Sequence, residues 1–307
     1  MRRRTFLGWS GALAGSLATA LVGCGRGKEA DGGPAYMAEP PSGAAGDVRY
    51  LAIHPLHNPL KLFEFYAPLV DYLNRRIPGL GLELEASNNY AHYETKIRDR
   101  TPAFLLPNPY QALMALDLGY NVIAEAGDSD DFRGVFIVRK DSPLAHPSDL
   151  KGKRAAYPAP TALAAAMMPQ YWLVEQGLKL QSLDNRYVGS QESAILNALH
   201  READIAVTWP PPWRAFQRDH PEDAAQLRLI WQTPPLINNA FMARDDMPEP
   251  LVTRLRALLL RLHEDPEGAA LLWKMETHRF YPADNARYRN AVGGFLTAYQ
   301  DRVGPLP

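Results

Sequence analysis

From residue 48 onward the chain alternates short β-rich runs with longer runs that have helical periodicity. The first pair is a strand over residues 48–53 and a helix over residues 62–74, in which apolar side chains recur at spacings of three and four. Strands that alternate with helices are typical of βαβ units, which place helices on the faces of a mostly parallel sheet. The pattern therefore predicts an α/β protein with mostly parallel sheet.

The alternation forms two similar series. Further strands are expected over residues 82–86, 103–106, 134–138, 154–157, 186–188, 204–209, 229–232 and 238–243. Further helices are expected over residues 90–98, 110–118, 161–176, 190–201 and 251–263, with Ser190 as an N-cap. We therefore predict a first lobe over residues 47–133, a second lobe over residues 134–234, and a return to the first lobe with C-terminal helices over residues 235–307.

Two lobes joined by two crossings imply a cleft between them, with hinges near residues 133–135 and 233–239. Ligands of open α/β sheets bind beyond the carboxyl ends of the strands. Two strands end in proline-rich loops that carry aromatic residues, with Asn108 and Tyr110 in the first loop and Trp209 in the second. These loops are expected to face each other across the cleft. The alternative is that the aromatic side chains pack in the core.

The first residues resemble a bacterial export signal. Three arginines at residues 2–4 precede an apolar stretch over residues 6–22, and the run ends in Leu21-Val22-Gly23-Cys24, which resembles the lipobox of lipoproteins. The arginines also resemble a twin-arginine signal. We predict a signal peptide over residues 1–24, lipidation at Cys24 and a flexible tether over residues 25–46, which are rich in Gly, Ala, Pro and Ser. A retained transmembrane anchor is disfavoured because the apolar stretch is short and contains Gly and Ser.

Composition and motifs argue against several functional classes. Cys24 is the only cysteine, so the acylated chain would have no thiol for a disulfide, a nucleophile or a metal site. The formal net charge of -1 gives no basic field for nucleic acid. His54 and His57 lack a carboxylate at a recognised metal-binding spacing and are interpreted as the polar rim of the cleft. The sequence also lacks the common nucleophile and cofactor motifs, so we expect no enzyme activity, no cofactor, no metal and no nucleic-acid partner.

The order of segments resembles a known family over residues 48–288. Its carriers are Phe65-Tyr66-Ala67-Pro68-Leu69-Val70-Asp71-Tyr72-Leu73, Tyr90, Tyr110, Val138-Arg139-Lys140-Asp141-Ser142 before Asp149-Leu150-Lys151-Gly152-Lys153, Gly189-Ser190-Gln191-Glu192-Ser193-Ala194-Ile195 and Ala203-Asp204. This order is similar to that of the substrate-binding proteins of phosphate, phosphite and phosphonate ABC transporters. The resemblance implies the type II periplasmic-binding fold, with a ligand cleft between two lobes.

The resemblance also implies a binding site, with two departures from the family pattern. The family's Ser-Thr-Ser-Gly turn, which binds a tetrahedral oxyanion at a helix start, reads Thr161-Ala162-Leu163-Ala164-Ala165 here, and Gln191 replaces a family histidine. The expected ligand is a phosphonate- or phosphite-like oxyanion or a small organic solute with an apolar body. The implied ligand-binding residues are Tyr90, Asn108, Tyr110, Thr161, Gln191, Glu192, Asp204 and Trp209.

The sequence thus predicts a monomeric solute-binding lipoprotein of an ABC transporter, anchored through Cys24 at the periplasmic face of a bacterial membrane. Its expected partners are a small-molecule ligand, the transporter permease and the membrane that holds the lipid. The first alternative is a sensor that presents its ligand to a membrane receptor kinase. The second is an enzyme on the same fold.

Overall fold

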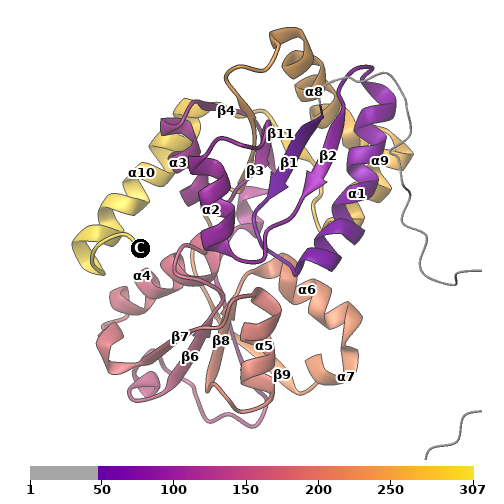
Figure 1. Cartoon of the computed structure of the whole chain (residues 1–307). Helices are drawn as coiled ribbons and strands as arrows, with labels where there is room; N and C mark the ends of the chain where they lie inside the picture. Colours follow the sequence, from indigo (N-terminus) through magenta and orange to yellow (C-terminus); the bar gives the residue numbers. More distant parts are fainter. Residues whose placement is uncertain (1–47) are drawn as a thin grey trace, which may run out of the picture. The chain divides into compact units, whose positions relative to one another are not determined.

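The computed structural model describes residues 48–307, so the predicted signal peptide, the lipidation site at Cys24 and the predicted tether all lie outside the described residues. Two sheets organise the described part of the chain (Figure 1). The first has the strand order β11-β4-β10-β3-β1-β2, and the second has the order β7-β6-β8-β5-β9. We call the part built on each sheet the first and the second lobe.

The first sheet contains β1 (Arg49–Ile53), β2 (Leu82–Glu85), β3 (Phe104–Leu106), β4 (Tyr120–Ala126), β10 (Asn239–Arg244) and β11 (Phe280–Tyr281). The second contains β5 (Val135–Arg139), β6 (Arg154–Tyr157), β7 (Asp184–Tyr187), β8 (Ile205–Thr208) and β9 (Leu227–Gln232). The helices are α1 (Pro59–Arg76), α2 (Tyr90–Arg98), α3 (Pro109–Asp117), α4 (Met168–Glu175), α5 (Gln191–Leu199), α6 (Pro210–Asp219), α7 (Pro221–Ala224), α8 (Glu249–Arg261), α9 (Pro266–Lys274) and α10 (Asn285–Arg302).

The predicted α/β class is correct, and most strands of each sheet run in one direction as expected, but the strand pairing is mixed. Strand β1 pairs in parallel with β2 and β3, and β6 pairs in parallel with β7 and β8. Strands β10, β4 and β11 pair antiparallel in the first sheet, and β5 pairs antiparallel with β8 and β9 in the second. Strands β5 and β10 follow the two crossings between lobes and run against the direction of the βαβ units in their sheets. Strand β9 is antiparallel to β5 and therefore runs in the same direction as β6, β7 and β8.

Two predicted helical regions differ in detail. The helix expected over residues 161–176 begins at Leu163 with a π-helical turn, Leu163–Met167, and continues as α4. Pro169 has no N–H to donate, and in a regular α-helix its ring would clash with the carbonyl group four residues earlier. The wider π-helical turn relieves this clash. Helix α6 starts at Pro210 where only a proline-stiffened loop was expected. Proline suits the first turn of a helix because the missing N–H would have no partner there.

Side chains cap several of the helices that begin at the carboxyl ends of strands. Asn89 accepts from the amide of His92 at α2, and Asn108 forms a reciprocal capping box with Gln111 at α3. The predicted N-cap Ser190 accepts from the amide of Ser193 at 3.0 Å, which confirms that prediction. These caps fix where each helix starts relative to the strand before it.

Two extended segments cross between the lobes and are hydrogen-bonded to each other. The amide of Gly134 donates to Oγ1 of Thr233 at 2.9 Å, and the amide of Thr233 donates back to the carbonyl of Gly134 at 2.9 Å. The amide of Leu236 donates to the carbonyl of Phe132 at 2.9 Å. The crossings therefore form a short paired connection.

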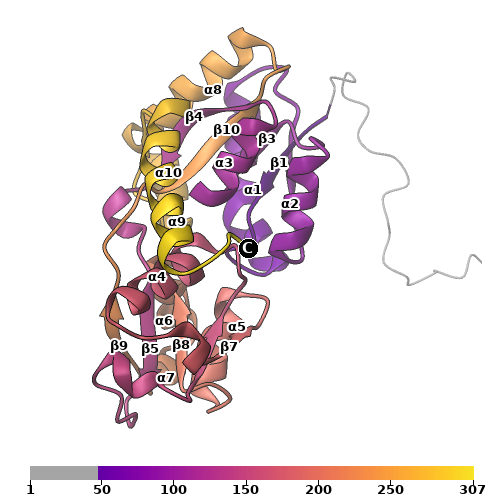
Figure 2. The same cartoon turned by 90° about the vertical axis from the view of Figure 1, so that its left-hand side faces the viewer.

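Helix α10 makes a further connection between the lobes. It packs against α3 of the first lobe and α4 of the second, and Figure 2 shows it running along both. The hydroxyl of Tyr299 donates to Oε1 of Gln170 at 3.0 Å, and Arg302 pairs with Glu175 at 3.1 Å.

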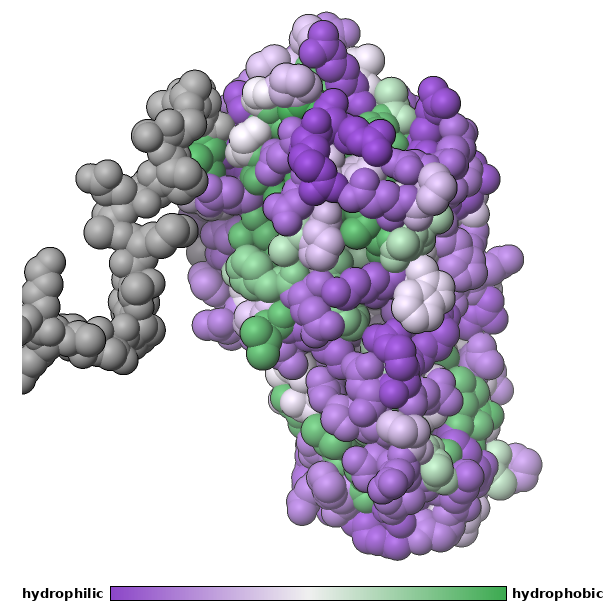
Figure 3. Space-filling model, turned by 90° about the vertical axis from the view of Figure 1, so that its right-hand side faces the viewer, coloured by the Kyte–Doolittle hydropathy of each residue, from purple (hydrophilic) through white to green (hydrophobic). Residues whose placement is uncertain are grey.

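Large apolar side chains are exposed on α1 and α9, at Leu60, Phe63 and Trp273. Figure 3 shows the side of the molecule that carries α1, where hydrophobic patches lie between hydrophilic side chains. Scattered apolar side chains are common on protein surfaces and assign no function by themselves.

Candidate functional site

A small pocket lies between the two lobes, beyond the carboxyl ends of their strands. The first lobe contributes His54, Tyr90 and Asn108, the first crossing contributes Phe132, and the second lobe contributes Ala162, Leu163, Ala164, Ala165, Gln191 and Trp209. Its volume of about 10 Å³ holds roughly one water molecule. The lobes are therefore closed on each other in this structure.

Five helices begin at this pocket. Tyr90 and Gln191 are the first residues of α2 and α5, Asn108 and Trp209 precede α3 and α6, and Ala162 precedes the π-helical turn that leads into α4. Each helix start carries a partial positive charge from its aligned peptide dipoles. The residues that line the pocket include no Lys, Arg, Asp or Glu. The convergent helix starts therefore favour an anion without placing a formal charge in the pocket.

The free hydrogen-bond donors at the pocket are mainly backbone amides. The first bonds within the π-helical turn are those from the amides of Ala166 (2.7 Å) and Met167 (3.4 Å) to the carbonyl of Ala162. The amides of Leu163, Ala164 and Ala165 precede these bonds and have no acceptor within the helix. The N-cap is an alanine and caps none of them. These three amides can therefore donate to an oxyanion although the turn lacks the family's hydroxyls.

A chain of side-chain hydrogen bonds aims a further donor at the pocket. Oγ1 of Thr208 donates to Oε1 of Gln191 at 2.8 Å, and Nε2 of Gln191 donates to the hydroxyl oxygen of Tyr90 at 3.1 Å. Because Tyr90 accepts from Gln191, its own O–H remains able to donate. Burial raises the pKa of Tyr90 above its usual range, so the hydroxyl keeps its proton.

Two hydrogen bonds join the lobes across the pocket. One is the bond from Gln191 to Tyr90, and the other runs from Nδ2 of Asn108 to the carbonyl of Thr161 at 3.0 Å. Thr161 thus contributes its backbone, and its side chain is not part of the lining. Lobe separation would break both bonds and release polar groups for a ligand.

The sequence predicted His54 and His57 as the polar rim of the cleft and did not include either among the ligand-binding residues. Both are buried, with 2% and 6% of their surface exposed. Nδ1 of His54 lies 2.9 Å from the carbonyl oxygen of Leu106, and its ring lies beside those of Tyr90 and Trp209. The position of His54 after a buried strand was a signal for the site, but its burial depends on helices far away in sequence.

Three predicted site residues make other contacts. The hydroxyl of Tyr110 donates to the carbonyl of Pro307 at 2.9 Å, Glu192 lies 3.5 Å from His220, and Asp204 pairs with Arg154 at 3.1 Å. None of the three lines the pocket. Tyr110 follows the lining residue Asn108 by two positions, and Glu192 follows the lining residue Gln191 by one. Because successive helical residues are rotated by about 100° around the helix axis, both side chains point away from the pocket. Asp204 lies just before β8 and Trp209 lies just after it, so the two residues are at opposite ends of this strand.

Replacing Tyr110 with Phe should therefore leave ligand affinity unchanged within about twofold, the scale of a substitution outside a site. Titration calorimetry with a phosphonate, the ligand class that the resemblance implies, measures this directly. A tenfold loss would place Tyr110 in contact with the ligand.

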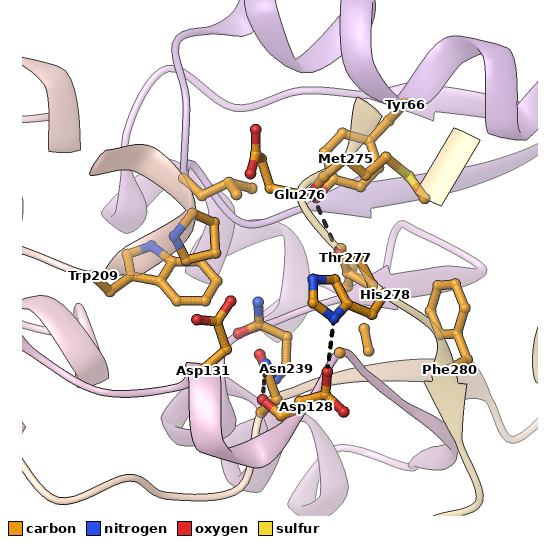
Figure 4. Close-up of a pocket in the computed structure, with 16 residues that line it drawn as sticks. Tyr66, Asp128, Asp131, Trp209, Asn239, Met275, Glu276, Thr277, His278 and Phe280 are labelled. Carbon is orange, nitrogen blue, oxygen red and sulfur yellow. Dashed lines mark hydrogen bonds and ion pairs between the residues drawn. The ribbon is translucent and has the colours of Figure 1, made fainter. Parts of the chain in front are cut away.

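A second pocket lies beside the crossings, and Trp209 lines both (Figure 4). Its charged groups are already paired. Nδ1 of His278 lies 3.2 Å from Asp128, a contact that Figure 4 marks with a dashed line. Arg214 pairs with Asp131 at 2.7 Å and with Glu276 at 3.0 Å. The charged side chains of this pocket are therefore already engaged in ion pairs. The pocket between the helix starts is the better candidate for a ligand site.

No cluster of three or more His, Cys, Asp or Glu side chains within residues 48–307 is arranged to hold a metal ion. None of the helices in this part of the chain combines the length and the apolar character needed to cross a bilayer.

Comparisons with known proteins identify the family. Residues 51–288 match the family described as "ABC transporter, phosphonate, periplasmic substrate-binding protein". The probable ABC transporter phosphite binding protein PhnD1 of Prochlorococcus marinus (strain MIT 9301) is 22% identical over 183 residues, which make up 55% of this chain and 62% of that protein. The match thus spans less than two thirds of the relative's length.

Solved structures share the fold. PhnD1 from Prochlorococcus marinus (MIT 9301) in complex with methylphosphonate gives a TM-score of 0.75 at 18% identity, covering 82% of this chain and 98% of that one. A binding protein component of an ABC phosphonate transporter from Pseudomonas aeruginosa gives 0.75 at 16% identity, covering 82% and 86%. The predicted fold and family are confirmed. The chain belongs to the family of periplasmic substrate-binding proteins of phosphonate ABC transporters.

Proposed function

We propose that this chain is the solute-binding component of an ABC transporter and that it binds a small tetrahedral oxyanion of the phosphonate and phosphite class between its lobes. The observation that carries the proposal is the set of free amides at Leu163, Ala164 and Ala165, where five helices begin around one pocket. The family consists of transporter binding proteins rather than enzymes, and membership implies a location outside the cytoplasm.

An oxyanion suits the pocket better than an apolar organic solute does. The pocket offers an apolar floor at Ala162–Ala165, which suits a short alkyl group. Its polar groups, however, are mainly donors, namely the amides and the hydroxyl of Tyr90. A cluster of donors at helix starts favours the negatively charged oxygens of a tetrahedral anion. The loss of the family's hydroxyls lowers the number of donors but leaves the backbone contribution intact.

Lobe closure is the proposed route from binding to transport. In the open form the bonds of Gln191 to Tyr90 and of Asn108 to Thr161 are broken, and the ligand enters. Closure then buries the ligand between the lobes and presents one compact surface to the permease. We propose residues 47–133 and 235–307 as the first lobe and residues 134–234 as the second, with the crossings as the hinge.

Ion pairs on α6 would stabilise the closed form. Arg214 on α6 reaches Glu276 after α9, and Asp219 at the end of α6 lies 2.6 Å from Lys61 on α1. These pairs connect the second lobe to the first, so opening would separate them. They are partly exposed, and each is expected to stabilise closure by a modest amount.

Replacing Arg214 with Met should therefore weaken ligand binding by about three- to tenfold, because a smaller fraction of the protein would be closed. Calorimetry gives the affinity and small-angle scattering gives the closure. The matched control is Arg186→Met, which removes an ion pair within β7 of the second lobe alone, between Arg186 and Asp184 at 2.6 Å. Equal losses in both variants would contradict a role of Arg214 in closure.

The anchoring and assembly of the chain are part of the proposal. Cys24 would carry the lipid, residues 25–46 would act as the tether, and the folded part would work as a monomer beside the permease. Metabolic labelling with a radioactive fatty acid, compared between the native chain and Cys24→Ser, tests the lipidation.

Titration of the purified protein with phosphite, methylphosphonate and phosphate tests the binding function. Ligand at about a hundred times its dissociation constant should add roughly 2.7 kcal/mol to the unfolding free energy, which raises the melting temperature by a few degrees. Binding of a small organic solute but of no oxyanion would overturn the ligand class. A scattering curve unchanged by a bound ligand would contradict closure, and capture of a receptor kinase without a permease would favour sensing.

A further inference from the structure

We infer that His54 selects the protonation state of the ligand: its Nε2 accepts a hydrogen bond from an O–H group, so the pocket prefers a monoprotonated tetrahedral oxyanion over an unprotonated one of the same shape and charge. The inference rests on the proposed function, because it concerns the ligand of the same pocket. It names a specificity residue that lies outside the set expected from the sequence.

The environment of His54 fixes its tautomer. Nδ1 lies 2.9 Å from the carbonyl oxygen of Leu106. A carbonyl oxygen only accepts, so Nδ1 must carry the hydrogen, and Nε2 of the neutral ring is then an acceptor. Within residues 48–307, Nε2 has no hydrogen-bond partner, and the ring is part of the pocket lining. Nε2 is therefore an acceptor available to a ligand.

The ring is held in place and stays neutral. It is 2% exposed and lies between Tyr90 and Trp209, with ring centroids 6.3 Å and 6.5 Å away. Burial lowers the pKa of His54 to about 4, although the bond to Leu106 opposes the shift. Near neutral pH the ring therefore does not become a cation, and Nε2 keeps its lone pair.

Each of the other side-chain acceptors of the lining already accepts one hydrogen bond, whereas Nε2 of His54 accepts none. Oδ1 of Asn108 accepts from the amide of Gln111 at 3.1 Å, and Oε1 of Gln191 accepts from Thr208 at 2.8 Å. The hydroxyl oxygen of Tyr90 accepts from Gln191. A ligand O–H group therefore finds its acceptor at Nε2, while the ligand's unprotonated oxygens find donors at the amides of Leu163–Ala165.

A ligand without a proton would place an oxygen lone pair against the lone pair of Nε2. A site built to bond a particular hydrogen rejects an analogue that lacks it, because a buried polar group is left without a partner. Methylphosphonate as its monoanion and methanesulfonate have the same shape and the same charge, and they differ by one O–H hydrogen. They form a matched pair for this test.

The experiment is a calorimetric titration of the full chain, purified in detergent, with both ligands at a slightly acidic pH where methylphosphonate is mainly its monoanion. We expect methylphosphonate to bind about ten- to a hundredfold more tightly than methanesulfonate, the range for an unpaired buried polar group. This comparison needs no variant and so does not depend on the folding of one.

Two substitutions then assign the preference to Nε2. In His54→Asn the side-chain amide can replace Nδ1 and keep the bond to Leu106, but no atom stands where Nε2 was. The preference should fall to about threefold or less, the scale of a neutral substitution. In His54→Gln the longer side chain reaches the Nε2 position and can present its carbonyl oxygen, so part of the preference should return. Thermal melts establish that each variant is folded.

Each outcome separates this inference from the proposed function. If the native protein binds both anions equally, or if His54→Asn keeps the full preference, the role of His54 is wrong while oxyanion binding stands. If neither anion binds, the proposed ligand class fails, and this inference fails with it. A preference in the native protein that disappears in His54→Asn and partly returns in His54→Gln supports the assignment.

Discussion

Acidification from about pH 7 to about pH 5 should lower the free energy of unfolding by about 4 kcal/mol, because two buried histidines stay neutral in the folded protein. Burial lowers the pKa of His54 to about 4 and that of His57 to about 3, from the ordinary value of 6.5. Well above pH 6.5 both rings are neutral in the folded and the unfolded chain. Below it the unfolded chain binds protons that the folded chain does not, so stability falls with falling pH. Each ring then contributes about 2 kcal/mol by pH 5.

Urea unfolding at the two pH values measures this loss of stability. The variant His57→Phe then shows how much of the loss comes from His57. Phe fills the space beside Phe65, whose ring lies 5.1 Å from that of His57, and it does not titrate. The loss on acidification should then fall to about 2 kcal/mol. His92 on α2 is exposed and serves as the control, so His92→Asn should leave the loss unchanged. An undiminished loss in His57→Phe would show that other groups cause the acid sensitivity.

Replacing Ala164 with Asp should weaken oxyanion binding by about a hundredfold or more. Ala164 lines the pocket in the first turn of its helix, beside the free amides. A carboxylate there would repel a ligand anion about 5 Å away by roughly 3 kcal/mol at an effective dielectric constant near 20. It would also accept from the amides that the ligand needs. The first turn of a helix tolerates an acidic residue, so the fold should persist.

Ala164→Asn is the matched control, since it has nearly the same size and shape without the charge. It is expected to crowd the closed pocket and lose some affinity, but far less than the carboxylate does. Calorimetry on both variants separates charge from volume. Equal losses would mean that the pocket excludes both by size, and that the helix starts do not act through their charge.

The fold was largely predictable because its signals are local. Apolar spacing located most strands and helices, and the start of α2 at Tyr90 and the strand β6 were predicted to the residue. Strand β4 was not predicted, and it contains the buried acid Glu125. Its carboxylate is satisfied by Arg287 at 2.9 Å and by the amide of Asn238 at 3.0 Å, and these partners lie more than 100 residues away.

The site was only partly predictable for the same reason. Tyr90, Asn108, Gln191 and Trp209 lie where strands end and helices begin, and the structure brings them into one pocket. The strand-end rule locates such positions but not the direction of each side chain, which is why Tyr110 and Glu192, close by in sequence, lie elsewhere. The burial of His54 depends on packing between lobes, which no local pattern contains.

The central claim is that the helix starts between the lobes bind an oxyanion. The most direct test is a titration of isotope-labelled residues 45–307 with methylphosphonate, followed by the amide signals in two-dimensional NMR. We predict the largest saturable shifts at the amides of Leu163, Ala164 and Ala165, with smaller shifts at the starts of α2 and α5. Shifts confined to other surfaces, or no saturable shift at these amides, would contradict the account.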